Sequence, residues 1–344
     1  MNPSHRAQTE RQNRGGGIIA PPPFRRSLSF LAALFCVSPL DALAAAPPAG
    51  PGFKPASLAY VLQARGLAGT RAAVVEKLAA CDRDLVVLDA SFEVGQAGWT
   101  ATELAAIRAG KPGRRVVAYV SVGEAEDYRP YWQKHWDADG DGRPDATAPK
   151  FLNTENPDWK GNYRVRYWHS GWQAIMLPVV DQVAAQGFDG IYLDIVDAFE
   201  FYEYDPVTKD WRDHLRNPET GRTYREDMIT WVRAIAERAR AKRPGFLVIP
   251  QNAAQLLADA GYRDLISGIA VEDLLVDGKR LRTEKESAYT IGHLKRLASA
   301  GKPVLVVDYP QSKAVHAAAF QRAATHGFTL LLTDRKLTTL GESR

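Results

Sequence analysis

Eight short apolar runs, each followed by a segment with helical spacing, constrain the fold of this chain more than any other feature. Capping-box patterns begin the helical segments after Thr100 and Thr283. Eight β-then-α units in roughly 290 residues predict an α/β protein, a single (β/α)8 TIM barrel. An open doubly wound sheet stays an alternative, because strand order cannot be read from the pattern. The predicted strands are 58–63, 84–89, 115–122, 189–194, 246–250, 268–272, 303–308 and 328–333.

The N-terminal segment is typical of an export signal. Arg25 and Arg26 precede a short apolar stretch, and Ala42-Leu43-Ala44 is a small-x-small cleavage site. The apolar stretch is too short to span a membrane. The arginine pair does not decide between Sec and twin-arginine export. We therefore predict a periplasmic or secreted protein without a stable membrane span, divided into a signal peptide (1–46), a Pro/Gly-rich linker (47–57) and a barrel domain (58–344).

Charge and cysteine content exclude several classes of protein. The chain of 344 residues has a formal charge of +4, and five arginines against two acids lie in the first 46 residues. The remainder is close to neutral, so we expect no nucleic-acid partner. Signal cleavage would remove Cys36 and leave Cys81 alone, without an internal disulfide. We expect a monomer.

Each apolar run finishes on, or just before, a polar residue. In a barrel these positions surround the C-terminal mouth, where the catalytic groups of this architecture lie. Capping of the next helix explains a single Asp equally well. Glu and Gln are weak N-caps, however, so capping alone does not explain the whole set. The residues are Gln63, Asp89, Glu124, Asp194, Gln251, Asn252, Glu272, Asp308 and Asp334.

A long aromatic and acidic insertion follows the third predicted strand, from about 124 to 170. Its Trp and Tyr rings either pack the loop onto the barrel or offer flat faces to sugar rings. The stretch "DADGDGRPD" resembles a calcium loop, with Asp137, Asp139 and Asp141 at alternate positions and Asp145 at the ninth. Ala148 replaces the bidentate Glu at position twelve. An acidic turn stabilised by its own Asx hydrogen bonds is the alternative.

Four motifs together resemble glycoside hydrolase family 114, the endo-α-1,4-polygalactosaminidase family. They are "YVSVGEAEDYRPYW", "NPDWKGNYRVRYW", "GFDGIYLDIVDAFEFY" and "IAVEDLL". The match runs from about Leu58 to the last predicted strand. The resemblance implies a (β/α)8 barrel and a polysaccharide substrate rich in α-1,4-linked galactosamine or N-acetylgalactosamine. Paired-carboxylate hydrolysis needs no cofactor or metal.

The resemblance also implies roles for two acids. Asp194 corresponds to the nucleophile and Glu272 to the general acid/base. Asp273 competes with Glu272, but successive strand residues point to opposite sides and only one can face the mouth. We expect the other acids to make the mouth attractive to a cationic amino sugar; these are Asp89, Glu124, Glu126, Asp197 and Asp308. Predicted sugar contacts are Trp168, Tyr192, Asn252 and Tyr309.

Two other functions stay open at this stage. One is a catalytically silent carbohydrate-binding barrel that serves exopolysaccharide assembly, because a fold does not guarantee activity. The presence of both Asp194 and Glu272 favours the enzyme. The other is a metal-dependent polysaccharide hydrolase or deacetylase. The scattered histidines weigh against zinc and leave magnesium or calcium possible.

Overall fold

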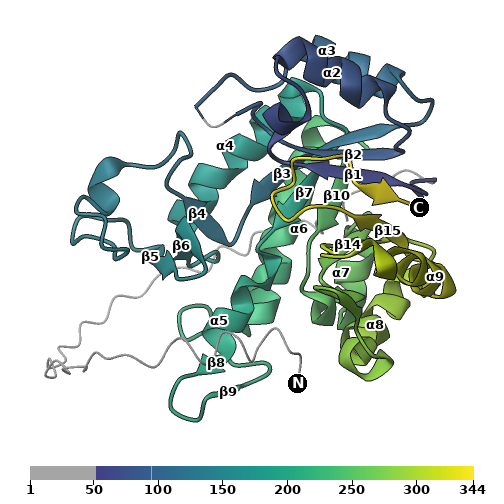
Figure 1. Ribbon diagram of the computed structural model, residues 1–344. Helices are drawn as coiled ribbons and strands as arrows, with labels where there is room; N and C mark the ends of the chain where they lie inside the picture. The colour runs from purple at the N-terminus through teal and green to yellow at the C-terminus, as the bar shows by residue number, and fades with distance from the viewer. Residues whose placement is uncertain (1–51, 94) are drawn as a thin grey trace, which may run out of the picture. The chain divides into compact units, whose positions relative to one another are not determined.

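A computed structural model describes residues 52–93 and 95–344 (Figure 1). The predicted signal peptide and the start of the predicted linker lie outside the described residues. In the described part of the chain, no helix combines the length and the apolar character that crossing a membrane requires.

Eight parallel strands carry the fold, and they coincide with the eight predicted apolar runs. Five form one sheet in the order β1-β2-β3-β7-β10, and the other three continue as β11-β14-β15. Their bounds are β1 Leu58–Val61, β2 Leu85–Asp89, β3 Arg115–Ser121, β7 Gly190–Asp194, β10 Leu247–Pro250, β11 Ile269–Glu272, β14 Val304–Asp308 and β15 Thr329–Leu332.

The strands follow one another in space as they do along the chain. A parallel bridge between Gln251 and Ala270 joins the two sheets. A doubly wound sheet would reverse its strand order at a switch point, so that alternative is wrong and the fold is the predicted (β/α)8 barrel. Among the described residues no ladder pairs β15 directly with β1. Instead β16 (Glu342–Ser343) pairs antiparallel with β15, and Oγ of Ser343 accepts a 2.9 Å hydrogen bond from the Leu58 backbone nitrogen.

Helices connect the strands and cover the outside of the barrel (Figure 1). The predicted capping boxes at Thr100 and Thr283 are confirmed, and Thr223 forms a third. The helices are α2 Arg71–Ala80, α3 Ala101–Ala109, α4 Ser170–Gln186, α5 Phe199–Glu203, α6 Tyr224–Lys242, α7 Ala260–Leu265, α8 Glu284–Ser299 and α9 His316–His326. Short 3₁₀ turns are η1 Ala64–Leu67, η2 Lys134–Trp136, η3 Val196–Ala198, η4 Ala254–Ala258 and η5 Lys313–Val315.

Two apolar cores follow from the alternation of side chains along the strands. The larger lies between the strands and the helices and includes Trp172 and Trp231. The smaller fills the inside of the barrel and is unusual in its tyrosines. Four of them enter it, namely Tyr60, Tyr119, Tyr192 and Tyr309.

The insertion after β3 folds into a small antiparallel sheet in the order β4-β6-β5. Most of its rings pack on one another: Trp132 lies 4.5 Å from Tyr163, and Trp136 lies 5.7 Å from Phe151, between ring centres. The packing interpretation therefore holds for these rings. Its strands are β4 Glu124–Glu126, β5 Leu152–Asn156 and β6 Trp159–Val165; two further hairpins are β8 Tyr204–Asp205 with β9 Asp210–Trp211, and β12 Val276–Asp277 with β13 Arg280–Leu281.

Candidate active site

Asp194 and Glu272 stand at the C-terminal ends of β7 and β11 and share one hydrogen-bond donor. The side-chain nitrogen of Gln251 donates to Oδ1 of Asp194 at 3.1 Å and to Oε2 of Glu272 at 2.8 Å. Gln251 follows β10, the strand that lies between β7 and β11 in the barrel. The predicted pair is therefore brought together by the strand order, because all three strands end at the same mouth.

Three donors surround the carboxylate of Asp194. Besides Gln251, the Tyr119 hydroxyl donates to Oδ2 at 2.7 Å, and the Ile195 backbone nitrogen donates to Oδ1 at 2.8 Å. Burial raises the pKa of Asp194 to about 6, although the bonds from Tyr119 and Ile195 oppose the rise. Ile195 makes this contact from a left-handed backbone conformation, at φ 57°, which is unfavourable for a β-branched residue. Asp194 is thus held ionised at neutral pH.

Glu272, in contrast to Asp194, is protonated at neutral pH. Burial, reinforced by the charge of Asp194, raises its pKa to about 8, against the hydrogen bond that Tyr309 donates to Oε1. The Asn252 side chain accepts from the Glu272 backbone nitrogen at 3.1 Å. At neutral pH the site therefore holds one ionised and one protonated carboxyl group, the division of labour that a nucleophile and a general acid require.

Asp273 turns away from this pair. Its backbone is left-handed at φ 52°, and its carboxylate forms a 2.7 Å ion pair with Arg335. The Arg335 guanidinium also lies 4.3 Å from the ring centre of Tyr309. Of the two adjacent acids, only Glu272 contacts Gln251 and Tyr309.

A second group of acids lies beside the pair, on the segment after β7. The Asn252 side chain also hydrogen bonds Asp197, and the Gln255 side chain donates to Glu200 at 2.5 Å. Burial raises the pKa of both Asp197 and Glu200, and their mutual charge adds to the rise at Asp197. Asp197 and Asn252 thus lie where the sequence placed them, next to the predicted catalytic acids.

Asp89 and Glu126 are tied to each other by Arg129. The guanidinium makes two bonds to Asp89, at 2.9 and 2.7 Å, and one to Glu126 at 2.6 Å. The Tyr128 hydroxyl donates to Glu126 at 2.5 Å. Both predicted acids are therefore paired with Arg129, a cation of the insertion. Tyr128 is 39% exposed and is the most solvent-exposed residue of this cluster.

Glu124 is held by the hairpin of the insertion. Asn156 donates to its carboxyl group at 2.8 Å, and Asn162 does so at 3.4 Å. Burial raises the pKa of Glu124 to about 7, and the nearby charge of Asp194 contributes to the rise. The hairpin thereby contributes to the wall of the mouth next to Asp194.

Three predicted contacts have other roles. Tyr192 is 0% exposed and packs inside the barrel against Tyr60, so it offers no surface to a sugar. The buried carboxylate of Asp308 accepts three backbone N–H groups, from Leu274, Leu275 and Val276, and so holds the loop after Glu272. The structure does not support either residue as a sugar contact, because Tyr192 is enclosed inside the barrel and backbone N–H groups occupy the Asp308 carboxylate.

Trp168 is the third correction. It packs in an aromatic cluster with Tyr202 and Tyr224, 4.7 and 5.2 Å away between ring centres, and its indole nitrogen donates to Glu219. No interaction within the described ranges joins Trp168 to Asp194 or Glu272. The ring packs the insertion against α5 and α6 instead.

The sequence did not mark Tyr119 or Arg129 as site residues, and it noted Gln251 only as a polar residue at a strand end. The position of Tyr119 in β3 could have marked it. Tyr119 lies two residues before Ser121, and Ser121 pairs with Asp194 of the neighbouring strand. Residues two apart share a face, so Tyr119 had to face the barrel interior just below the mouth.

The comparisons with known proteins agree with this architecture. Residues 42–344 match the model of glycoside-hydrolase family GH114. The chain belongs to this family. As a GH114 member it is a glycosidase, which agrees with the two facing carboxyl groups.

Proteins of other organisms are similar to this GH114 chain in sequence. An uncharacterized protein of Deinococcus radiodurans is 37% identical over 255 residues, 74% of each chain. An uncharacterized protein of Methanocaldococcus jannaschii is 36% identical over 240 residues, which cover 68% of this chain and 63% of the archaeal one.

Two solved structures resemble this GH114 chain in fold. The glycoside hydrolase domain of PelA from Pseudomonas aeruginosa has a TM-score of 0.58 at 18% identity, over 84% of this chain and 98% of that domain. Ega3 from Aspergillus fumigatus, solved with galactosamine, has a TM-score of 0.55 at 17% identity, over 87% and 96% of the two chains.

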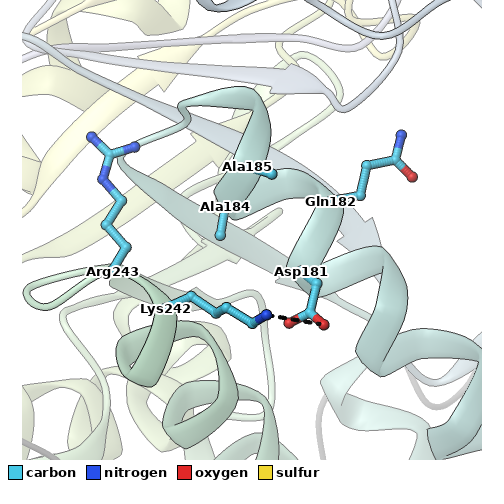
Figure 2. Close-up of a pocket in the computed structure, with 6 residues that line it drawn as sticks. All are labelled: Asp181, Gln182, Ala184, Ala185, Lys242 and Arg243. Atoms are coloured by element: carbon cyan, nitrogen blue, oxygen red, sulfur yellow. Dashed lines mark ion pairs between the residues drawn. The ribbon is translucent and has the colours of Figure 1, made fainter.

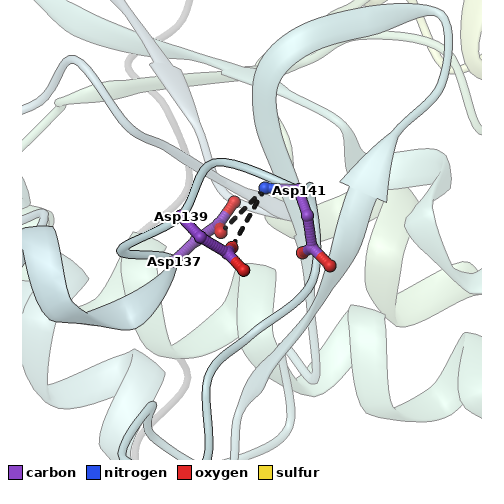
Figure 3. A group of neighbouring side chains, drawn as sticks. All are labelled: Asp137, Asp139 and Asp141. Atoms are coloured by element: carbon purple, nitrogen blue, oxygen red, sulfur yellow. Dashed lines mark hydrogen bonds between the residues drawn. The ribbon is translucent and has the colours of Figure 1, made fainter.

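The predicted calcium loop brings three of its four acids together (Figure 3). One carboxylate oxygen from each of Asp137, Asp139 and Asp141 lies within 4.8 Å of the others. These three carboxylates also accept backbone N–H groups within the turn: Asp137 accepts from Gly140 at 3.0 Å, Asp139 from Asp141 at 3.2 Å, and Asp141 from Arg143 at 2.8 Å. The fourth acid, Asp145, accepts from the Ala138 nitrogen at 2.8 Å. These bonds are the ones that an acidic turn stabilised by Asx hydrogen bonds would make. Calcium binding stays a prediction.

A surface hollow lies between the ends of α4 and α6 (Figure 2). Asp181 and Lys242, 3.9 Å apart, face each other across it. Since α4 ends just before β7 begins, the hollow lies at the end of the barrel opposite the two carboxyl groups. It has no part in the candidate active site.

Proposed function

We propose that this GH114 chain is an exported hydrolase of α-1,4-linked galactosamine or N-acetylgalactosamine polysaccharide, with Asp194 as nucleophile and Glu272 as general acid/base. The observation that carries the proposal is the pair of carboxyl groups joined by Gln251. Their pKa values are raised to about 6 and about 8, so at neutral pH Asp194 is ionised, as a nucleophile must be, and Glu272 is protonated, as a general acid must be.

The fold likeness to Ega3, which was solved with galactosamine, supports the choice of sugar. The acids around the pair support it as well. A protonated amino sugar carries a positive charge, and the charge of Asp194 acts on the neighbouring buried acid Asp197, so acids gather at this side of the pair. The N-terminal pattern supports export.

The spacing supports a retaining mechanism. The nearest oxygens of Asp194 and Glu272 cannot be farther apart than the sum of 3.1 and 2.8 Å, because both bond the same nitrogen. That limit is below the roughly 6.5 Å at which the carboxyl separations of inverting enzymes begin.

The proposed reaction has two balanced steps. In the first, an Asp194 oxygen forms a bond to the anomeric carbon while the bond to the leaving oxygen breaks, and the Glu272 proton passes to that oxygen. In the second, water attacks the anomeric carbon of the glycosyl ester, ionised Glu272 takes a proton from the water, and Asp194 leaves as a carboxylate. No metal or cofactor takes part.

Product analysis tests the proposal. The mature protein would be incubated with α-1,4-linked galactosaminogalactan and with its deacetylated form, beside Asp194→Asn and Glu272→Gln. We expect oligosaccharides from wild type only, and Asp273→Asn, the neighbouring acid that faces Arg335, is the matched control that keeps activity.

The outcomes separate the alternatives. Polymer that binds without being cut would support the silent binding barrel. Loss of activity with a chelator would support a metal-dependent enzyme. Turnover at the wild-type rate in both carboxyl variants would show that the assigned residues are wrong. Mass spectrometry of the exported protein would test cleavage near residue 44.

A further inference from the structure

We propose that Gln251 is a positioning residue that fixes both the spacing of Asp194 and Glu272 and the oxygen with which each of them reacts. This inference rests on the proposed function, because it assigns work within the same pair of acids. Gln251 itself need not touch the substrate, since its side chain is 2% exposed.

The backbone of Gln251 is attached to both strands that carry the acids. Its nitrogen donates to the Leu193 carbonyl at 2.8 Å, one residue before Asp194. It also forms the bridge to Ala270, and the next residue, Asn252, donates to the Ala270 carbonyl at 2.8 Å. A side chain that starts from so fixed a backbone can hold its amide at one place between the carboxyl groups.

The chemistry of the amide suits this position. A primary amide nitrogen has two hydrogens and does not accept, so it can donate to two carboxyl groups at once in every state of the reaction. Without a donor between them, two carboxyl groups this close would repel each other when ionised. A hydroxyl or a carboxyl group could not replace the amide, because each has at most one hydrogen to give.

The same bonds select the reactive oxygen of Asp194. Its Oδ1 already accepts from Gln251 and from the Ile195 backbone nitrogen. Its Oδ2 accepts from Tyr119, and in the described part of the chain no second donor bonds this oxygen. A carboxylate oxygen has two lone pairs in its plane, so Oδ2 keeps the pair that can attack the anomeric carbon.

In Glu272 the selection concerns the proton. Oε2 faces the amide nitrogen, which can only donate, and therefore must remain an acceptor. Oε1 faces the Tyr309 hydroxyl, which can reverse its role from donor to acceptor. We place the proton of the acid form on Oε1, where the Tyr309 hydroxyl can accept it until substrate binds, and from there it passes to the leaving oxygen.

Gln251→Met tests the inference, because methionine has similar length and no hydrogen to donate. We expect kcat to fall at least tenfold and KM to stay within about threefold, with the acid limb of the kcat/KM profile moved to higher pH as Asp194 loses a donor. Gln186→Met is the matched control: Gln186 is a half-buried glutamine whose amide donates to the backbone carbonyls of Ala90 and Trp99 instead of to the acids.

A second variant keeps the test decisive if Gln251→Met does not fold. Gln251→Glu has the same shape but adds a third acid, so we expect its rate, as a fraction of the wild-type rate at the same pH, to be lower at pH 8 than at pH 5, where the new acid is protonated and donates one hydrogen. A purely structural glutamine would not produce this pH dependence.

Two results would overturn the inference. Wild-type kcat and an unchanged pH profile in the folded Gln251 variants would remove the positioning role and leave the proposed function intact. Absence of product from wild type on both polymers would instead remove the proposed function, and the inference with it. Digests of wild type on the same polymers distinguish the two cases.

Discussion

The Tyr119 hydroxyl donates a 2.7 Å hydrogen bond to Oδ2 of Asp194, from the strand next to the one that carries the acid. Tyr119 is 7% exposed, so water does not readily replace the hydroxyl if it is removed. The bond stabilises the ionised form of Asp194 and opposes the effect of burial.

Tyr119→Phe is therefore expected to raise the pKa of Asp194. A lost hydrogen bond to a charged group is worth about 1.5 kcal/mol or more, which corresponds to about one pH unit. The acid limb of the kcat/KM profile should move up by that amount. Tyr167→Phe is the control, since the Tyr167 hydroxyl donates to the Tyr224 carbonyl at 2.7 Å; an equal shift in both variants would contradict the assignment.

Wild-type activity is expected to follow a bell-shaped pH profile. Asp194 must be ionised, so the rate falls as the pH drops through about 6; Glu272 must be protonated, so the rate falls as the pH rises through about 8. Measurement of kcat/KM from pH 4 to pH 10 tests both limbs. Constant activity up to pH 10 would exclude a carboxyl group as the acid.

Glu272 is expected to lower the free energy of unfolding at high pH. Its pKa is raised from 4.5 to about 8, so between these values the folded state holds a proton that the unfolded state lacks. Stability then falls as the pH rises through this window. Glu272→Gln removes this cost and should exceed wild type by on the order of 2 kcal/mol at pH 9, with little difference at pH 4.

Chemical denaturation at several pH values measures this effect. Glu286→Gln is a control of opposite sign, because capping and ion-pair bonds lower the pKa of Glu286 to about 2. That variant should lose stability above pH 4.5. A Glu272→Gln protein no more stable than wild type at pH 9 would contradict the raised pKa.

Arg129→Met is expected to destabilise the fold strongly. It leaves Asp89 and the 3%-exposed Glu126 without their shared cation. Removing one partner from a buried ion pair typically costs about 3–5 kcal/mol. Arg166→Met should cost less than about 1 kcal/mol, because the Arg166–Glu219 pair is exposed. Equal costs in urea titrations would show that Asp89 and Glu126 do not depend on Arg129.

The sequence predicted the barrel because each strand has a local sequence pattern of its own. An apolar run with a polar residue at or just after its end recurs eight times, and Asp194 and Glu272 lie at the ends of two such runs. The placement of these two residues therefore followed from strand boundaries alone, and the resemblance added their roles. Those roles stay a prediction until the variants are measured.

Roles that depend on distant partners were out of reach. Asp308 satisfies backbone nitrogens 32–34 positions away, and Trp168 bonds Glu219, 51 positions away. From the sequence, an acid that holds a loop and an acid that binds substrate both look like a polar residue after an apolar run. Only the burial and partners of each side chain separate them.

The two asparagines that reach Glu124 come from a single hairpin, β5–β6. Loops at the C-terminal face of a TIM barrel can change while the barrel stays the same. This hairpin can thus be replaced as a unit. Replacing it with the corresponding hairpin of a relative would change one side of the barrel mouth and leave the barrel unchanged. Substrate range within the family can diverge in this way while Asp194, Gln251 and Glu272 stay in place.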